Sequence, residues 1–158
     1  MLNVVLIEPE IPQNTGNIAR TCACVGAKLH LVEPMGFRAT ERNLKRAGCD
    51  YWDDVEIVRW ACADEFFATH ASGALGDGRL CLFTGQAQLH FADVTYGSDD
   101  FLIFGRESRG LDQAIIDAHS ESCVRIPMCE GIRSLNLSNA VAIGVFEALR
   151  QNNYPHLV

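Results

Sequence analysis

The sequence predicts an α/β protein built on a mostly parallel sheet flanked by helices. Short apolar runs of strand length, rich in β-branched residues, alternate along the chain with stretches of helical periodicity. Several of these runs end in polar loops that contain glycine or proline. With 158 residues, the chain is most economically a single domain over 1–158, large enough to bury roughly 70% of the surface of its unfolded form.

The expected elements follow in chain order. Strands are predicted at 2–7, 28–32, 55–58, 80–84, 101–104 and 123–126. The first helix is predicted to begin at Asn14 or Thr15 and to stop at Gly26, and further helices are predicted at 40–47, 64–70, 111–119 and from 136 or 138 to 152. The last helix carries one apolar stripe, and its glycine and alanines make it slim enough for close packing; the stripe is Leu137, Val141, Val145 and Ala148.

The cysteines and the apolar runs point to a cellular compartment. The seven cysteines are odd in number, widely spaced and free of any Cys-x-x-Cys pair. This pattern favours reduced, partly buried thiols in a cytosol and gives no reason to expect a metal site. No apolar run reaches the roughly 18 residues of a membrane span, and the N-terminus does not read as a signal peptide. We therefore expect a soluble cytoplasmic protein.

The charge pattern leaves nucleic-acid binding open. The formal net charge is −7, which argues against a nucleic-acid partner when the whole surface is averaged. A phosphate-binding face needs only a local cluster of cations, however, and one is present at Arg38, Arg42, Lys45 and Arg46. This cluster has two interpretations: an RNA-binding surface, or the ordinary solvated face of a helix.

Two loops near the C-terminus predict a ligand pocket. One follows the strand at 101–104 and contains Gly105 and Gly110, and the other opens at Pro127 after the strand at 123–126. Ligands of α/β proteins bind in the crevice beyond the carboxyl ends of the strands. Near a third strand end, Asn14 is either a site residue or a plain helix cap, and Arg20 is either a site residue or half of a surface salt bridge.

Common nucleotide and hydrolase motifs are absent. The segment Gly76-Asp-Gly78 begins like a dinucleotide fingerprint, but Cys81 occupies the place of the third glycine, and the glycines precede a predicted strand where the fingerprint requires them to follow one. The sequence contains no Walker loop and no Gly-x-Ser-x-Gly. Nicotinamide, flavin, nucleotide-hydrolysing and α/β-hydrolase chemistries are therefore disfavoured.

Three ordered motifs carry a family resemblance. Asn14-Thr-Gly-Asn-x-x-Arg20, Phe104-Gly-Arg-Glu-Ser-Arg-Gly-Leu111 and Ile126-Pro-Met128 with Ser134-Leu-Asn-Leu-Ser-Asn-Ala140 resemble the motifs of the SPOUT (SpoU-TrmD) RNA methyltransferases. The opening Glu8-Pro-Glu-Ile-Pro12, the loop Glu33-Pro-Met-Gly-Phe37 and the turn at 46–51 resemble the TrmL-type branch, which methylates the ribose 2′-hydroxyl of the wobble cytidine or uridine of tRNA.

The resemblance implies a fold, a cofactor and partners. It implies a deep trefoil knot over roughly 79–152, S-adenosyl-L-methionine as methyl donor, a homodimer, and tRNA as substrate, with leucine tRNAs expected. The cofactor role carries over to Phe83, Thr84, Gly105, Ile126, Ser134 and Asn136. Arg20, Asn14 and Glu107 match catalytic or loop-organising positions, and the basic cluster at 38–46 is expected to contact RNA.

The sequence allows more than one role for Arg20 and more than one target nucleotide. A guanidinium has a pKa above about 12 and no acceptor while protonated, so orienting the ribose or its phosphate is physically easier for Arg20 than removing a proton. Two alternatives share the motifs: a SPOUT enzyme acting on another tRNA or ribosomal RNA ribose, and a cofactor-binding module without catalysis. A cofactor-binding module without catalysis would not need Arg20 at the mouth of a pocket.

Overall fold

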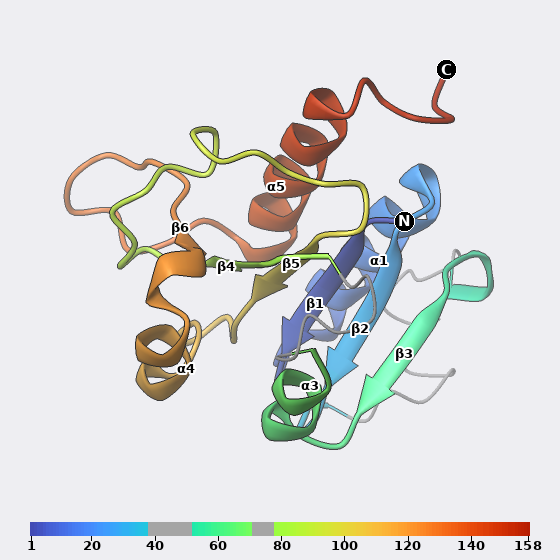
Figure 1. Cartoon of the computed structure of the whole chain (residues 1–158). Helices are drawn as coiled ribbons and strands as arrows, with labels where there is room; N and C mark the ends of the chain where they lie inside the picture. Colours follow the sequence, from blue (N-terminus) through green and yellow to red (C-terminus); the bar gives the residue numbers. More distant parts are fainter. Residues whose placement is uncertain (38–51, 71–77) are drawn as a thin grey trace.

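The computed structural model describes residues 1–37, 52–70 and 78–158, and within them one sheet of six parallel strands runs through the molecule (Figure 1). The strand order is β3-β2-β1-β5-β4-β6. The strands are β1 (Asn3–Ile7), β2 (Lys28–Val32), β3 (Ile57–Trp60), β4 (Leu80–Phe83), β5 (Phe101–Phe104) and β6 (Cys123–Val124). The predicted α/β class with a mostly parallel sheet is confirmed.

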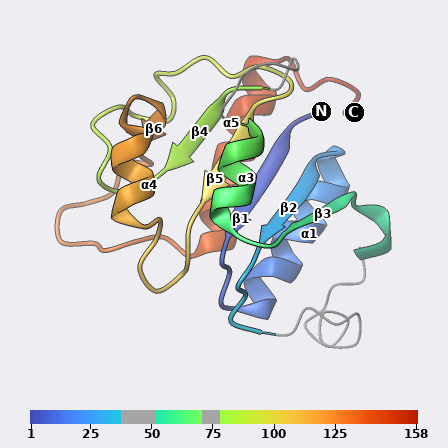
Figure 2. The ribbon, with the colours of Figure 1, turned by 60° about the horizontal axis from the view of Figure 1, so that its bottom comes forward.

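Helices cover both faces of the sheet. Between the strands lie α1 (Pro12–Val25), α3 (Ala63–His70), α4 (Gln113–Ala118), the C-terminal α5 (Leu137–Gln151) and the short 3₁₀ turns η1 (Trp52–Asp54) and η2 (Ser120–Ser122). Helices α1 and α5 pack on one face, and α3 and α4 pack on the other (Figures 1 and 2). The architecture is therefore a three-layer α/β/α sandwich.

Successive side chains of the central strands lie alternately on the two faces of the sheet. In β1, Val4 and Leu6 join the core beneath α1 and α5, whereas Val5 and Ile7 join the core beneath α3 and α4. All five residues of β1 are buried. This explains why 4–7 is continuously apolar, since a central strand of a parallel sheet is covered on both faces. The predicted stripe of α5 is confirmed as its buried face.

Helix α1 begins earlier than predicted. It starts at Pro12 with Ile11 at the N-cap, and no side chain caps it. Proline suits a first helical position because its φ is already helical and its missing N–H is not needed there. The expectation that Asn14 or Thr15 caps the helix is therefore wrong, and Asn14 is free for other contacts. The predicted stop at Gly26 is confirmed, with φ of 66° in the left-handed region.

Other boundaries shift by small amounts. Strand β3 lies at Ile57–Trp60, two residues later than predicted, and β6 ends at Val124, two residues early. Helix α4 is shorter at both ends than the predicted 111–119. The predicted helix at 40–47, with the basic cluster Arg38, Arg42, Lys45 and Arg46, lies outside the described residues.

The predicted pattern of free, partly buried thiols agrees with the structure. The six cysteines among the described residues are free, and three of them are buried. Within 1–37, 52–70 and 78–158, no helix is long and apolar enough to cross a membrane.

Candidate active site

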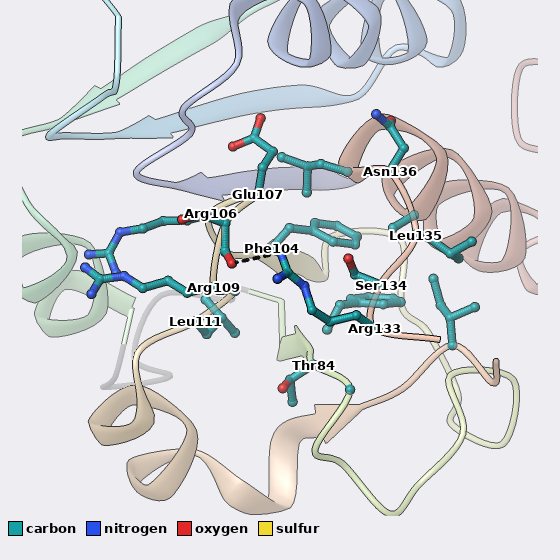
Figure 3. A pocket seen from close by; sticks show the side chains of 18 of the residues that line it. Thr84, Phe104, Arg106, Glu107, Arg109, Leu111, Arg133, Ser134, Leu135 and Asn136 are labelled. Carbon is teal, nitrogen blue, oxygen red and sulfur yellow. Dashed lines mark hydrogen bonds between the residues drawn. The ribbon is translucent and has the colours of Figure 1, made fainter. Parts of the chain in front are cut away.

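A cavity of about 670 Å³ opens at the carboxyl ends of β4 and β5. Three loops form its walls: the one after β4, the one after β5, and the long segment between β6 and α5 (Figure 3). Its size lies within the range of small-molecule sites. The lining residues are Ile11, Asn14, Phe83, Thr84, Gly85, Gln86, Phe104, Gly105, Arg106, Glu107, Ser108, Arg109, Gly110, Leu111, Ile126, Met128, Ile132, Arg133, Ser134, Leu135, Asn136, Leu137 and Ala140.

Two stacked aromatic rings form an apolar part of the wall. Phe83 ends β4 and Phe104 ends β5, and their ring centroids are 4.5 Å apart with 19° between the planes. Gly144 of α5 lies against them, because a Cβ at this position would be 2.8 Å from Cζ of Phe83. The glycine thus lets the helix approach the rings closely.

The loop after β5 is closed on itself by backbone hydrogen bonds. The Arg106 N–H donates to the Gly110 carbonyl at 3.1 Å, and the Gly110 N–H donates to the Arg106 carbonyl at 2.8 Å. Gly110 has φ of 74°. A Cβ on Gly105 would be 2.2 Å from backbone atoms of Gly110 and Leu111. Both glycines are therefore needed to make this loop, which exposes its backbone to the cavity.

Glu107 joins the loop after β5 to the loop after β1. Its Oε2 accepts the Glu10 N–H at 2.8 Å, and its Oε1 accepts the Ile11 N–H at 3.2 Å and the Asn14 side-chain amide at 3.1 Å. Three donors thus converge on one carboxylate, and two of them belong to the backbone just before α1. Glu107 organises the loop, and its carboxylate is engaged in these bonds.

A chain of amide hydrogen bonds extends from Glu107 to α5. Asn136 caps α5, and its Oδ1 accepts from the Ser138 and Asn139 N–H groups at 2.9 and 3.4 Å. Its amide nitrogen then donates to Oδ1 of Asn14 at 3.0 Å. Because backbone N–H groups fix the direction at both ends, the Asn14 amide must donate to Glu107. Asn14 therefore links all three sequence motifs.

Two further contacts reinforce the junction of the loops. Arg106 forms ion pairs with Glu8 and with Asp112, and its Nη1 lies 2.7 Å from Asp112 Oδ1. The hydrogen bond with Arg106 lowers the pKa of Asp112. Glu10 accepts the backbone N–H and hydroxyl of Ser108, both at 2.8 Å, and these bonds lower the pKa of the Glu10 carboxyl. Side chains of each loop thus form hydrogen bonds or ion pairs with the other, and these contacts hold the loops after β1 and β5 together.

The structure brings most of the predicted site residues together. All six expected cofactor residues line the cavity, as do Asn14 and Glu107. Arg20 does not line it: this residue lies on the third turn of α1 with an exposed side chain. The basic cluster at 38–46 lies outside the described residues.

Sequence reasoning missed two arginines of the site. Arg106 stands inside the second motif, and the structure places only 9% of its side chain in solvent and pairs it with two carboxylates. Sequence reasoning did not single out Arg133, which lines the cavity beside Ser134. The position of Arg133 next to a predicted cofactor residue was the signal for it.

The chain and its fold are those of a known family. The chain belongs to the SpoU rRNA Methylase family, whose model matches residues 1–146. Within it, the chain is 45% identical to the tRNA (cytidine(34)-2′-O)-methyltransferase of Escherichia coli strain K12, over 100% of this chain and 98% of that protein.

Solved structures agree at the level of the whole chain. One described as "Structural insights into the 2-OH methylation of C/U34 on tRNA" is 38% identical with a TM-score of 0.88, and the match covers 97% of each chain. A SpoU methyltransferase from Streptomyces viridochromogenes in complex with AdoMet shares the fold, with a TM-score of 0.80 at 22% identity over 97% of this chain and 61% of that one.

Proposed function

We propose that this protein transfers the methyl group of S-adenosylmethionine to the ribose 2′-hydroxyl of the nucleotide at position 34 of tRNA, a cytidine or a 5-modified uridine. The observation that carries the proposal is the convergence of all three motifs on one cavity, through the link Glu107–Asn14–Asn136. The full-length similarity to the position-34 enzymes favours this target over another tRNA or ribosomal RNA ribose.

The cavity fits the cofactor chemically. An adenine ring can lie beside Phe83 and against the aliphatic Ile126, and backbone groups near Thr84 and Gly105 can bind its edge. The cofactor has no phosphate, so a glycine-rich phosphate loop is not required. When bound, S-adenosylmethionine supplies an electrophilic methyl group. Ser134 and Asn136 would face the rest of the molecule.

The residues of this chain have to position the ribose. A 2′-hydroxyl is a weak nucleophile, so alignment with the methyl group is the main task. We assign Glu107 and Asn14 to holding the loop after β1 against the cavity, and Arg20 to orienting the ribose or its phosphate through bidentate hydrogen bonds. Arg20→Ala should cause a large loss of turnover, and retained turnover would exclude this role.

A homodimer and a shared RNA surface complete the proposal. Helix α5 exposes Ile143 (37%) and Phe146 (48%), large apolar side chains that a second copy would cover. Arg20 does not line the cavity of its own chain, which also favours a site completed by a second copy. Phe146→Glu should then yield a monomer in light scattering that has lost methyl transfer.

We infer that the basic cluster contacts tRNA and that 79–152 folds as a trefoil knot. Reversing the charge of Arg42 and Lys45 should weaken tRNA binding and leave cofactor binding intact. For the knot, the supporting feature is the return path from the edge strand β6 to α5, which packs on the same face as α1 near the middle of the sheet (Figure 1).

The decisive experiment is methyl transfer from labelled S-adenosylmethionine to bulk tRNA from a strain that lacks the endogenous enzyme. Mass spectrometry of nuclease fragments then maps the modified nucleotide and identifies the tRNA, including whether it is a leucine tRNA. A 2′-O-methyl pyrimidine at position 34 supports the proposal. Label at a different ribose, or no label despite cofactor binding, would contradict it.

A further inference from the structure

We infer that Arg133 binds a phosphate of the RNA backbone beside the methylated ribose. This inference rests on the proposed function, since it names the part of the cavity wall that receives the substrate. Arg133 belongs to the segment between β6 and α5 and lines the cavity. In Figure 3 its guanidinium reaches across toward the loop after β5, whereas Arg106 and Arg109 extend to the left, away from Ser134 and Leu135.

The charges around the cavity single out Arg133. Arg106 pairs with Glu8 and Asp112, and Arg109 lies 3.9 Å from Asp112. The Glu107 carboxylate accepts three N–H donors. Arg133 donates to the Ser108 carbonyl at 3.4 Å, which is a long bond to a neutral acceptor. Among the described residues, no carboxylate forms an ion pair with it. The cavity wall therefore presents a cation whose charge is not compensated.

The neighbours of Arg133 fit a nucleotide. Ile132, directly before it, is 58% exposed, and Leu135, two residues later, is 38% exposed. Both line the same cavity. An exposed cation between exposed apolar side chains matches a ligand with an anionic group next to an apolar one. A ribonucleotide combines a phosphate with the flat face of a base in this way.

The cofactor is a weaker match for this cation. S-adenosylmethionine carries a sulfonium and an ammonium against a single carboxylate, so its net charge is positive and a neighbouring guanidinium repels it overall. RNA carries a negative charge at every nucleotide, and arginine binds phosphate through paired N–H groups. The carboxylate of the cofactor is the one competing anion, and the experiment has to separate the two.

Arg133→Gln is the test, with Lys28→Gln as its matched control. Lys28 lies at the opposite end of the strands, where it pairs with Glu56 at 2.7 Å, so its loss changes the net charge equally but far from the cavity. Binding of tRNA is measured by fluorescence anisotropy over a series of salt concentrations, and S-adenosylmethionine binding by calorimetry. Arg133→Lys, which keeps the charge without the planar fork, is measured alongside.

Arg133→Gln should weaken tRNA binding about tenfold and lower the slope of log affinity against log salt by roughly 0.7 to 0.9, the share of one phosphate. Its cofactor affinity and melting temperature should equal those of wild type, because the side chain is exposed. Arg133→Lys should retain the slope. Lys28→Gln should bind tRNA like wild type.

Other results would overturn the inference. Weaker cofactor binding with an unchanged salt slope would assign Arg133 to the cofactor carboxylate, and equal losses in Arg133→Gln and Lys28→Gln would reduce its role to general charge. If the wild-type protein methylates tRNA but Arg133→Gln leaves the salt slope unchanged, this inference is rejected and the proposed function stands. A wild-type protein that neither binds nor methylates tRNA would reject the proposed function together with it.

Discussion

Replacing Glu107 by glutamine tests whether this residue holds the site together. The change preserves the shape of the side chain but substitutes an NH₂ group for one of the two oxygens. The carboxylate accepts three N–H donors, from Glu10, Ile11 and Asn14. In its best orientation, glutamine keeps the two bonds of Oε1 and turns its NH₂ toward the Glu10 N–H, so that two donors face each other.

The expected cost follows from this geometry. Losing a 2.8 Å hydrogen bond to a charged acceptor and opposing two donors costs about 2 kcal/mol of unfolding free energy. For a chain of this size, that cost corresponds to a melting temperature lower by about 4–8 °C. Turning the amide over does not help, because Asn14 cannot reverse its own direction while it accepts from Asn136.

The measurements are thermal unfolding and methyl transfer under saturating cofactor. Glu107→Gln should lower both, since the start of α1 is released from the cavity. Glu121→Gln is the control, because Glu121 is an exposed carboxylate of η2 far from this junction and should behave like wild type. If Glu107→Gln melts like wild type and keeps full turnover, the three hydrogen bonds do not organise the site.

Three further predictions concern the rings, the amide link and the buried histidine. Gly144→Ala should cost about 1–3 kcal/mol and weaken cofactor binding in calorimetry, because the new methyl group would lie 2.8 Å from Phe83 and must displace a ring that lines the cavity; unchanged cofactor affinity would contradict the assignment of that ring. Asn14→Asp should destabilise the fold and abolish methyl transfer at neutral pH, because an acceptor would then face Glu107 at 3.1 Å, and chemical denaturation should show a smaller loss at pH 5 than at pH 8. His30 accepts the Trp60 indole N–H on Nδ1 and lies 3.1 Å from Asn3 on Nε2, and burial lowers its pKa from 6.5 to about 4. Because the pKa of His30 is lower in the folded than in the unfolded protein, the unfolded state binds the proton first as the pH falls below 6.5, and the folded state loses stability. The free energy of unfolding of the wild type should therefore drop by about 2 kcal/mol between pH 7 and pH 5. His30→Gln should not show this drop.

The linear pattern predicted the sheet because its central strands, such as β1 and β5, are buried on both faces. A short, continuous apolar run such as Phe101–Phe104 is most stable as a buried central strand. The observed bounds of β5 agree with the prediction residue for residue. The apolar stripe of α5 and the stop of α1 at Gly26 likewise depend on local spacing and local backbone preference, which the sequence displays directly. The short edge elements β3 and β6 were placed less well, because their ends are set by pairing with neighbouring strands.

The sequence also identified the residues of the cavity but not their contacts. Phe83, Gly105 and Ser134 are far apart in the chain, and the motif resemblance grouped them before any geometry was known. The position of Arg20 outside the cavity of its own chain was not evident from its motif, because spacing along a helix does not say which way the helix faces relative to a distant loop.

The sequence by itself therefore determined the fold class, the main elements and the family, since these depend on local periodicity and on motifs that are contiguous in the chain. Only the tertiary structure decided what the polar side chains bind. Asn14 is a reasonable helix cap by local preference, yet it donates to Glu107 and accepts from Asn136, 93 and 122 residues further along the chain. Buried donors and acceptors need hydrogen-bond partners, and the fold decides which groups lie close enough to serve. The number of residues between two groups in the sequence does not predict the distance between them in the fold.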